Sequence, residues 1–464
     1  MLIKGKHILV VGLGRTGAAL VRFLVRRGAR VTATDQADAA ALEACLAGLS
    51  DLGDAEITME LGGHRPETFE SADLIVLSPG VPHTMEPLRR ARKKGIAVIG
   101  EIELAYRFMQ TPIIAITGTN GKSTTTLLAG QILTDAGFRV FVGGNLGTPL
   151  IEYADQGAGA DFAVVEISSF QLDTIERFQP KVALLLNVTA DHLDRYADFD
   201  AYVRSKGRIF ENQTADDVAV INAADPAIQS LVPAISARLL CFNTHAQSQF
   251  GAFLENARIR FSLPGREAYW LDCSRSPLIG GHNRENIAAA GLAAAAVGAP
   301  FGIIQKTIEG FHGLSHRMSP VADFQGVQFI DDSKATNVDA VVRALAGFST
   351  PVILIMGGRE KGGSYSALKE LFPGRIKHLI VMGEAAPAIE KTLGEKAATT
   401  RAASMAEAVD IALAHGVAGD TVLLSPACSS FDMYESYAHR GADFVKCVHE
   451  IGRRKMAGGA DKNG

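Results

Sequence analysis

The sequence predicts an α/β protein with three domains, each built around a parallel sheet that helices cover on both faces. Short runs of Val, Ile and Leu alternate with helical patterns almost from end to end of the 464 residues. Strands that form continuous apolar runs are buried on both faces, as they are in parallel sheets between helices. At about 150 residues per domain, a chain of this length forms roughly three domains. Hydrophobic residues make up 47% and charged residues 21%, which is typical of a folded protein.

Charge and cysteine content exclude several classes of protein. The formal net charge is −4 with both signs scattered, so the chain lacks the concentrated basic surface of a nucleic-acid-binding protein. The five cysteines form no closely spaced pair, which argues against a zinc knuckle and a disulfide framework. No apolar run reaches the roughly 18 residues of a membrane span, and no signal-like segment is apparent. We expect a cytoplasmic, monomeric protein that binds neither nucleic acid nor membranes.

The expected elements fall into three blocks, with predicted domain boundaries at residues 1–102, 103–313 and 314–464. The expected strands of the first block are His7–Val11, Arg30–Thr34, Leu74–Leu77 and Ala97–Ile99. The second block has expected strands at Ile113–Ile116, Phe162–Val165 and Val182–Leu186, and an Ala-rich helix at Asn286–Val297. The third has expected strands at Val327–Ile330, Val352–Met356, His378–Val381 and Thr421–Leu424, and a closing helix near Tyr434–Gly452.

The sequence GTNGKST at residues 118–124 follows the strand Ile113–Ile116 and opens the helical pattern Thr125–Ala136. Glycines let backbone N–H groups turn inward around phosphate oxygens, and the helix N-terminus adds positive potential. Lys122 then reaches the terminal phosphates, and the Ser123 hydroxyl is placed to ligate Mg²⁺. A plain Gly-rich turn is the alternative, but strand, loop and helix in register favour mononucleotide binding. The predicted ATP-binding residues of the loop are Gly118, Thr119, Asn120, Gly121, Lys122, Ser123 and Thr124.

A second glycine-rich turn, GLGRTG at residues 12–17, also lies between a strand and a helix, and Asp35 ends the next strand. Alone, this pattern is the dinucleotide fingerprint, with the acidic residue poised for a ribose hydroxyl. An NAD-dependent oxidoreductase is therefore a competing interpretation, and a purely structural turn is another. The sequence offers no obvious acid–base set for hydride transfer, so we favour a non-redox diphosphate ligand. The turn Ser78-Pro79-Gly80 ends another strand of the block and is placed to close over that ligand.

Two further residues of the second block suit cations. Glu166 lies at the carboxyl end of an expected strand, where ligands collect in open α/β sheets, and a carboxylate beside a phosphate loop is a natural Mg²⁺ ligand. His192 follows the next strand and would bind a second cation or orient a phosphate. A structural histidine that closes a turn is the alternative.

Lys206 lies on one stripe of an expected helix, together with Phe199, Val203 and Phe210. A lysine on an apolar stripe usually extends its amine outward to water. The functional alternative is partial burial, which lowers the pKa of a lysine. A neutral amine adds CO₂ to become a carbamate, which turns a cation into a metal-binding carboxylate.

Three strand ends of the third block carry dense polar groups. They are residues 331–337 (DDSKATN), 357–362 (GGREKG) and 425–432 (SPACSSFD). Each alone suits an ordinary loop. Together they resemble a crevice that binds a carboxylate ligand.

All these motifs together resemble the Mur ligase family, across essentially the whole chain and in the same order. The motifs are GLGRTG, GTNGKST, GGNLG, EISSFQL, NVTADHLDR, the Lys206 helix, GGHNRENIAAA, LSHRM, DDSKATN, GGREKG and SPACSSFDMY. The phosphate loop would fit many ATPases, whereas the series fits few families. Folylpolyglutamate synthetases share the central portion but lack the amino-terminal GLGxTG domain.

The resemblance implies an ATP-dependent, ADP-forming ligase that adds D-glutamate to UDP-N-acetylmuramoyl-L-alanine through an acyl phosphate, in peptidoglycan precursor synthesis. It implies an amino-terminal Rossmann-like domain for the UDP substrate, a central P-loop ATPase domain, and a carboxy-terminal Rossmann-like domain for the amino acid. It also implies two Mg²⁺ ions. Another Mur-type or folylpolyglutamate-type amide ligase is the alternative; an NAD-binding oxidoreductase or sensor, and a simple ATPase or kinase, are the others.

The resemblance also assigns roles to residues. Catalytic roles go to Lys122, His192 and Lys206, and metal ligation to Ser123, Glu166, His192 and Lys206 as a carbamate. Further ATP contacts are Asn283, Asn286, Arg317 and Asp332. The UDP-substrate contacts are Gly14, Arg15, Thr16, Asp35, Ser78, Gly80, Asn145, Ser168 and Gln171. The D-glutamate contacts are Lys334, Thr336, Lys361, Ser430 and Phe431, where Arg359-Glu360 and Tyr437 depart from the pattern of some members.

Overall fold

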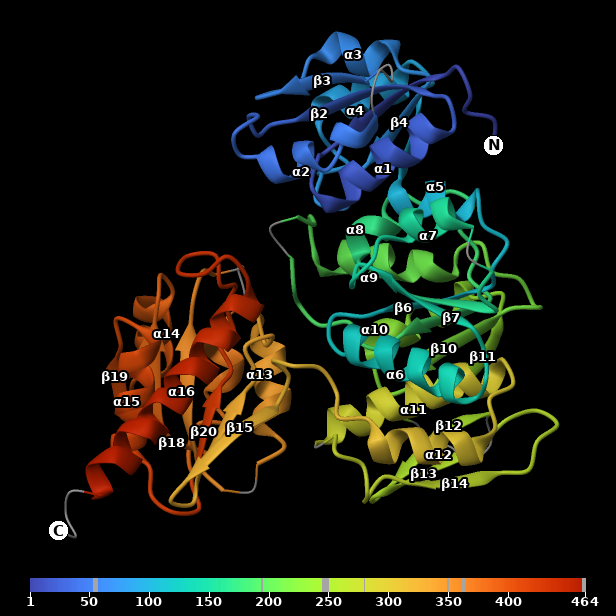
Figure 1. The fold of residues 1–464 in the computed structure, drawn as a ribbon. Coiled ribbons are helices and arrows are strands. Elements are labelled where there is room, and N and C mark those ends of the chain that lie inside the picture. The colour runs from blue at the N-terminus through green and yellow to red at the C-terminus, as the bar shows by residue number, and fades with distance from the viewer. Residues whose placement is uncertain are drawn as a thin grey trace. The chain divides into compact units, whose positions relative to one another are not determined.

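The computed structural model describes residues 1–52, 57–157, 159–192, 195–243, 250–278, 280–348, 350–360 and 364–460, with side chains up to residue 453. They form three sheets (Figure 1). Two compact units hold them: unit 1 comprises Met1–Val188, Asp200–Ser274 and Asn286–Glu309, and unit 2 comprises Thr189–Phe199, Arg275–Glu285 and Gly310–Gly464. Within the described part of the chain, no helix combines the length and hydropathy needed to cross a membrane.

The first sheet belongs to unit 1, is parallel throughout, and has the strand order β3-β2-β1-β4-β5. Its strands are β1 (His7–Val11), β2 (Arg30–Asp35), β3 (Ile57–Leu61), β4 (Leu74–Leu77) and β5 (Ala97–Gly100). Its helices are α1 (Arg15–Arg26), α2 (Glu43–Ala47), α3 (Pro66–Ser71) and α4 (Glu86–Lys93). The four expected strands are confirmed. The edge strand β3 was not expected, because Thr58 and Met59 are exposed and interrupt any apolar run.

The second sheet has the order β14-β13-β12-β11-β10-β9-β6-β8-β7. Its strands are β6 (Ile113–Thr117), β7 (Val140–Gly144), β8 (Phe162–Glu166), β9 (Val182–Leu185), β10 (Val218–Asn222), β11 (Arg238–Phe242), β12 (Gly251–Glu255), β13 (Arg258–Ser262) and β14 (Tyr269–Asp272). Its helices are α5 (Glu101–Tyr106), α6 (Lys122–Asp135), α7 (Leu150–Gln156), α8 (Ser169–Leu172), α9 (Phe199–Gly207), α10 (Pro226–Gln229), α11 (Gly281–Ala296) and α12 (Phe301–Gly310).

A fully parallel second sheet was expected, and this expectation is wrong at one edge. Strands β12, β13 and β14 pair antiparallel. Along β13 the buried side chains of Ile259 and Phe261 alternate with the more exposed Arg258 and Arg260. This alternation is typical of a sheet with one covered face, where antiparallel strands occur.

The third sheet lies in unit 2 and has the order β15-β16-β20-β17-β18-β19. Its strands are β15 (Ser319–Phe324), β16 (Val327–Asp331), β17 (Val352–Gly357), β18 (Ile376–Met382), β19 (Thr399–Arg401) and β20 (Thr421–Leu424). Its helices are α13 (Val338–Leu345), α14 (Ala386–Leu393), α15 (Met405–His415) and α16 (Tyr437–Ala460). One apolar cluster joins the sheet to α13 and α14, and another joins it to α15 and α16. Only β15 runs antiparallel.

Strand pairing brings polar loops together at one edge of each sheet. In the first sheet Val11 pairs with Leu77, so the turns after β1 and β4 are neighbours. In the second sheet Ile116 pairs with Glu166, which places the end of β8 beside the loop after β6. The prediction of three α/β blocks, each with its own sheet, agrees with this architecture.

Candidate active site

The loop of residues 118–124 connects β6 to α6, as the sequence predicts. Gly121 has a φ of 85°, and a Cβ there would overlap the side chain of Asn286, so only glycine fits. The Lys122 ammonium donates to the carbonyl oxygens of Gly118 and Thr119, both at 2.9 Å. The loop is thus wrapped around its own lysine.

Asn187, which follows β9, is hydrogen-bonded to the same loop. Its side-chain oxygen accepts from the N–H of Asn120 at 2.8 Å, and its amide nitrogen donates to the carbonyl of Asn120 at 3.0 Å. The N–H of Thr119 donates to the carbonyl of Asn187 at 2.9 Å. Sequence reasoning missed this residue; its signal was an asparagine at a strand end next to the phosphate loop.

Two oxygen-bearing side chains that could bind a cation, Ser123 after β6 and Glu166 at the end of β8, lie at neighbouring strand ends. Ser123 and Glu166 are each 3% exposed, and one carboxylate oxygen of Glu166 accepts from the Asn145 amide at 2.7 Å. Among the described residues, no three His, Cys, Asp or Glu side chains form a ready-made metal site. Mg²⁺ usually takes one or two carboxylates and completes its shell with water and substrate phosphates. A hydroxyl and a carboxylate here fit that ion.

Lys206 is buried beneath the loop. Its side chain is 2% exposed, and its amine donates to the carbonyl of Gly118 at 2.9 Å. The amine also lies 4.7 Å from the ring centroid of Tyr202, whose hydroxyl is 3.3 Å from that of Thr119. The outward, solvent-seeking orientation is therefore wrong, since the lysine meets the phosphate loop instead of water.

His192 belongs to unit 2, together with Asp191 and Asn337. It has a φ of 56°, and its carbonyl accepts from the N–H groups of Arg195 and Tyr196 at 2.9 and 3.3 Å. Its Nε2 lies 3.7 Å from the Asp191 carboxylate, which also accepts from the Asn337 amide at 3.1 Å. The backbone of His192 thus closes a turn while its ring stays half-buried beside a carboxylate.

A cavity of about 460 Å³ opens at the ends of β1 and β4 and is bounded by the loop after β7. Its lining contains all the predicted UDP-substrate residues except Ser168: Gly14, Arg15, Thr16, Asp35, Ser78, Gly80, Asn145 and Gln171. Ser168 is one step removed, because its N–H and hydroxyl both donate to the Gln171 side-chain oxygen at 3.0 Å. The first and second sheets therefore contribute to one pocket.

The glycine-rich turn is shaped by close packing and by Asp35. A Cβ on Gly17 would overlap the carbonyl oxygen of Gly12, which also accepts from the Ser78 hydroxyl at 2.7 Å. Asp35 accepts from the N–H groups of Leu13 at 2.6 Å and Ala37 at 2.9 Å. Its carboxylate therefore braces the turn. No side chain caps α1, which leaves the start of that helix available to an anion.

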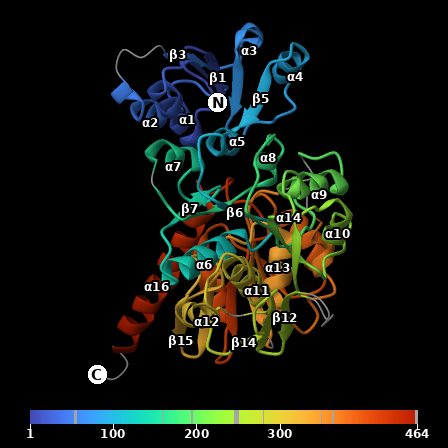
Figure 2. The same cartoon turned by 90° about the vertical axis from the view of Figure 1, so that its right-hand side faces the viewer.

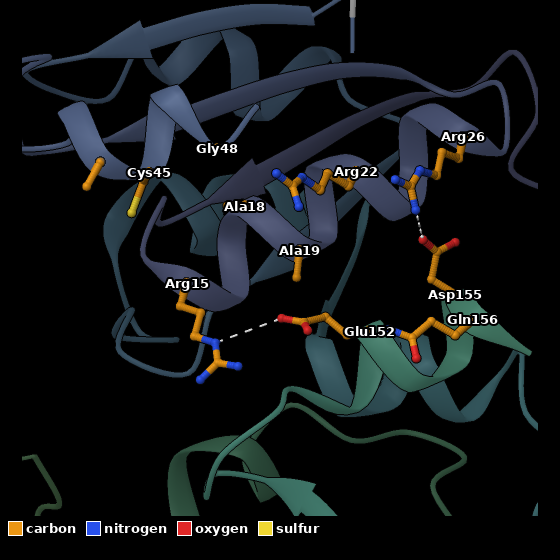
Figure 3. Close-up of a pocket in the computed structure, with 11 residues that line it drawn as sticks. Arg15, Ala18, Ala19, Arg22, Arg26, Cys45, Gly48, Glu152, Asp155 and Gln156 are labelled. Carbon is orange, nitrogen blue, oxygen red and sulfur yellow. Dashed lines mark hydrogen bonds and ion pairs between the residues drawn. The ribbon is translucent and has the colours of Figure 1, made fainter. Parts of the chain in front are cut away.

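A second cavity, of about 480 Å³, lies between α1 and α7 (Figure 3). Arg15 and Arg26 of α1 face Glu152 and Asp155 of α7 across it. Arg26 meets Asp155 at 2.7 Å, Arg15 lies 3.9 Å from Glu152, and Arg22 lies 3.6 Å from Asp51. The guanidinium groups that line this cavity therefore face carboxylates.

The predicted ATP contacts outside the loop are distributed between the two units. Asn286 is in unit 1, where its side-chain oxygen accepts from the Thr125 hydroxyl at 3.3 Å. Asn283, Arg317 and Asp332 belong to unit 2. Burial raises the pKa of Asp332 to about 7, against the opposing effect of Arg317 and of hydrogen bonds from Ser425 (2.9 Å) and the N–H of Met318 (3.3 Å). The Nε of Arg317 is buried without a hydrogen-bond partner among the described residues.

The predicted D-glutamate residues are only partly described. Lys334 follows β16, and its ammonium lies 5.1 Å from the ring centroid of Tyr437. Thr336 is half-buried, Ser430 is buried, and Phe431 is 64% exposed. Lys361 lies outside the described residues.

Sequence reasoning missed Arg440, which joins the three polar strand ends of the third sheet. Its guanidinium is buried and donates to four backbone carbonyls, those of Ser333 (2.9 Å), Cys428 (3.1 Å), Gly357 (3.3 Å) and Ser429 (3.4 Å). Burial lowers its pKa to about 10. Its signal was a charged residue within the apolar pattern of the closing helix.

Three family models together match most of the chain. They are the Mur ligase MurD-like amino-terminal domain at residues 6–100, the Mur ligase middle domain at 116–294, and the Mur ligase glutamate ligase domain at 316–428. Among solved structures, a pseudomurein peptide ligase type C from Methanothermus fervidus aligns with a TM-score of 0.61 at 20% identity, covering 96% of this chain and 100% of that one. MurF from Acinetobacter baumannii aligns with a TM-score of 0.61 at 19% identity, covering 96% and 91%. At such identities the likeness concerns the fold.

Sequence relatives are much closer. The UDP-N-acetylmuramoylalanine–D-glutamate ligase of Desulfosudis oleivorans is 51% identical over 448 residues, covering 97% of each chain. The enzyme of the same name from Geotalea daltonii is 47% identical over 459 residues, covering 99% of each. With this identity along the full length, and with three domain models matched in order, the chain belongs to the Mur ligase family.

Proposed function

We propose that this chain joins D-glutamate to UDP-N-acetylmuramoyl-L-alanine with conversion of ATP to ADP and phosphate, as a step in peptidoglycan precursor synthesis. The observation that carries the proposal is the phosphate loop with Lys122 and, beside it, Glu166, in the same unit as the Gly-rich pocket. Relatives that are 51% and 47% identical carry the name of this activity. An amide ligase needs both a nucleotide site and an acyl-substrate site, and we assign these to the phosphate loop and to the Gly-rich pocket.

In the first step, the terminal carboxylate of the substrate attacks the γ-phosphate of ATP and forms an acyl phosphate. A carboxylate is a poor acylating group because its leaving group would be oxide, whereas the acyl phosphate expels phosphate. Phosphoryl transfer asks little covalent chemistry of the protein, so positioning and charge neutralisation carry the step. We assign these tasks to Lys122 and the N–H groups of the loop, and nucleotide contacts also to Asn283, Asn286, Arg317 and Asp332.

Mur ligases use ATP and Mg²⁺, and a bound Mg²⁺ neutralises charge on the transferred phosphate. We assign Ser123 and Glu166 to one ion, and His192 with carbamylated Lys206 to a second. Support for the carbamate comes from the burial of Lys206 against the loop. In that modification the ammonium first loses a proton, and the neutral amine nitrogen then bonds to CO₂ and releases a second proton. A buried cation is thereby replaced by an anionic carbamate.

In the second step, the amine of D-glutamate attacks the acyl phosphate, and a tetrahedral intermediate expels phosphate. The amine must lose a proton, for which His192 and a neighbouring carboxylate are the two candidates. We assign the amino-acid pocket to Lys334, Thr336, Lys361, Ser430 and Phe431. Two of these are lysines, which suit a ligand with two carboxylates.

We further propose a cytoplasmic monomer with domain boundaries near residues 102 and 313. The boundaries fall between the last strand of one sheet and the first strand of the next.

The test is ATP-dependent phosphate release with UDP-N-acetylmuramoyl-L-alanine, in parallel with D-Glu, L-Glu, L-Lys and no amino acid. We expect release that requires both the UDP substrate and D-Glu, with the amide product seen by mass spectrometry. Release without selectivity for the amino acid would indicate a simple ATPase and overturn the proposal. Binding of NAD without consumption of ATP would favour the oxidoreductase alternative.

A further inference from the structure

The short helix α5 connects the first sheet to the second and carries two buried carboxylates. Figures 1 and 2 both place α5 between the first sheet and the helices α7 and α8. Glu101 is 2% exposed and Glu103 is 0% exposed. A buried carboxylate is costly unless hydrogen-bond donors surround it, so each must have a set of partners.

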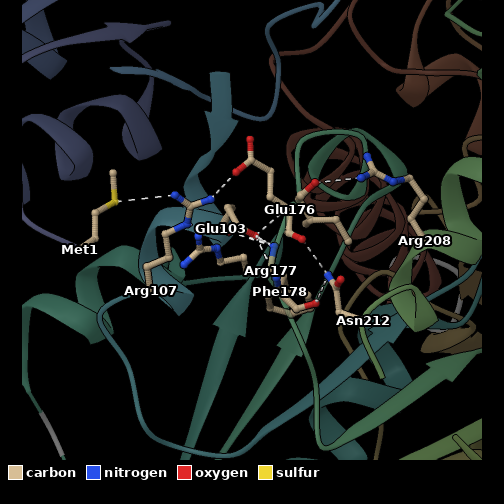
Figure 4. A network of polar contacts seen from close by, with 9 residues as sticks. Met1, Glu103, Arg107, Glu176, Arg177, Phe178, Arg208 and Asn212 are labelled. Atoms are coloured by element: carbon tan, nitrogen blue, oxygen red, sulfur yellow. Dashed lines mark hydrogen bonds and ion pairs between the residues drawn. The ribbon is translucent and has the colours of Figure 1, made fainter. Parts of the chain in front are cut away.

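Glu103 fastens α5 to the segment after α8 (Figure 4). Its oxygens accept from three successive backbone N–H groups, those of Glu176, Arg177 and Phe178, at 2.9 to 3.0 Å. Arg107 adds a bond from its Nε at 2.7 Å. None of these partners lines the Gly-rich pocket, so Glu103 serves the connection between the sheets.

Glu101 has different partners, and they lead to the pocket. It accepts from the N–H of Ile151 at 2.7 Å, and the N–H of Leu150 and the side chain of Gln171 face the same carboxylate. Leu150 is the first residue of α7 and follows the pocket residues Asn145, Gly147 and Pro149.

The side chain of Gln171 is held at both ends. Its oxygen accepts from the N–H and the hydroxyl of Ser168, and its amide nitrogen faces the carboxylate of Glu101. A Cβ on Gly100 would overlap the Thr174 hydroxyl, so the backbone before Glu101 packs directly against the end of α8. The Glu101 carboxylate therefore contacts both segments that follow strands of the second sheet and border the pocket: the start of α7 after the loop, and Gln171 in α8.

We propose that Glu101 is a positioning residue for the UDP-substrate pocket, and that its ionised carboxylate sets the affinity for the muramoyl substrate by ordering Gln171 and the loop at Asn145–Pro149. This inference rests on the proposed function for the identity of the ligand. Glu101 itself does not line the pocket.

The ionised form matters because the three groups that face the Glu101 carboxylate, the N–H groups of Leu150 and Ile151 and the side-chain amide of Gln171, are all donors. Burial raises the pKa of Glu101 to about 7, with the nearby Glu152 carboxylate acting in the same direction and the three hydrogen bonds opposing it. Above that pH the carboxylate accepts from all three donors. Below it, the added proton turns one acceptor into a donor that faces another donor, and the pocket wall loosens.

Other charged groups on the elements around Glu101 have their own partners. On α7, Glu152 lies 3.9 Å from Arg15, and Asp155 meets Arg26 and Arg27. After α8, Asp173 lies 3.6 Å from His83, and on α5 itself Glu103 meets Arg107. Strands β4 and β5 carry no charged residue. The substrate contributes a diphosphate diester and a carboxylate, neither of which gains a proton near neutrality.

The experiment is steady-state kinetics of wild type, Glu101→Gln and Glu103→Gln from about pH 6 to about pH 8.5. In wild type, KM for the UDP substrate rises as the pH falls through about 7. In Glu101→Gln we expect a KM raised by about tenfold at high pH, a kcat within about twofold, and no contribution from this group to the pH slope. His83 stays in the variant, so any pH dependence from its pairing with Asp173 persists there.

Glu103→Gln is the matched control, since it removes an equally buried charge from the same helix. It should lower Tm but retain the wild-type KM and its pH slope. A folded Glu101→Gln with wild-type KM and slope would contradict the inference, as would equal changes in both variants. If wild type shows no D-Glu-dependent phosphate release, the proposed function fails instead.

Calorimetric titration of wild type with UDP-N-acetylmuramoyl-L-alanine covers the case in which the variant does not fold. Binding that favours ionised Glu101 must release a proton near pH 7, which appears as a binding enthalpy that depends on the ionisation heat of the buffer. Absence of proton release near neutrality would overturn the inference.

Discussion

Lys206 is buried, although a lysine in such a helical pattern usually extends its amine into water. The helical stripe with Val203 and Phe210 left both orientations open, because periodicity gives the face of a residue and not the position of its amine. The structure settles the burial, through the contact with the Gly118 carbonyl. That the Lys206 nitrogen is carbamylated is our proposal.

We predict that Lys206→Ala lowers kcat at least about 100-fold, since loss of outer partners of a metal site alone typically costs about 10–100-fold. Short carboxylates such as formate or acetate should restore part of the activity by occupying the space of the carbamate. Phosphate release with and without added carboxylate measures this, with the exposed Lys93→Ala as control. Activity that is neither lost nor restored would rule out the carbamate.

The raised pKa of Asp332 predicts that the folded protein loses stability as the pH rises, whereas an ion-paired surface carboxylate has the opposite effect. The pKa of Asp332 in the folded protein is about 7, above its ordinary value of 3.8, so the folded state binds the proton more tightly than the unfolded state. Stability from this group is therefore full below the unfolded pKa and lost as the pH rises through about 7. Asp332→Asn should raise the free energy of unfolding by about 1–3 kcal/mol at pH 8 and much less at about pH 5. Thermal denaturation at the two pH values tests this, and a pH-independent difference would contradict it.

The sequence analysis did not identify the residues that support the site. Lys122, Glu166 and Asp35 stand in motifs at strand ends, where chemistry and position coincide. Glu101 contacts the start of α7, and Asn187 contacts the phosphate loop. Both contacts join segments that are far apart in the sequence. A charged residue in an unremarked short helix gives no sign of its partners until the chain is folded.

At the scale of elements, the strands expected from the sequence were continuous apolar runs, whereas half-exposed strands were missed, and so was the fully buried strand β10. Strands β1, β6 and β17 are buried along nearly their whole length, which leaves a run visible in the sequence. Strands β3 and β13 alternate or expose their side chains, as edge and hairpin strands do. Periodicity alone does not separate these from loops.

The turn before α1 predicts a sharp difference between two glycines. Gly17→Ala would press its Cβ against the Gly12 carbonyl, so we expect a loss of about 2–3 kcal/mol in stability and a raised KM for the UDP substrate. Gly302→Ala, in α12 with open space around it, should be neutral or stabilising by about 0.5–1 kcal/mol. Urea denaturation and substrate KM of both variants test the pair. Equal effects would show that the close approach in the turn has no energetic weight.

At the scale of the whole molecule, the two compact units predict unfolding that departs from a single two-state transition. All the predicted UDP-substrate residues belong to unit 1. The substrate should therefore stabilise unit 1 selectively, by about 2.7 kcal/mol at 100 times its Kd. Differential scanning calorimetry with and without UDP-N-acetylmuramoyl-L-alanine measures this. A uniform shift of all transitions would contradict the assignment of the pocket to one unit.

The strand order of the third sheet affects how the chain folds during its synthesis on the ribosome. Strand β20 is the last strand to be made, yet it lies between β16 and β17 and pairs with both. Until residues Thr421–Leu424 leave the exit tunnel, two apolar strands of unit 2 present unpaired edges, which are templates for aggregation. Chaperone demand should thus peak late in translation, and a transcript truncated just before codon 421 should yield an insoluble product.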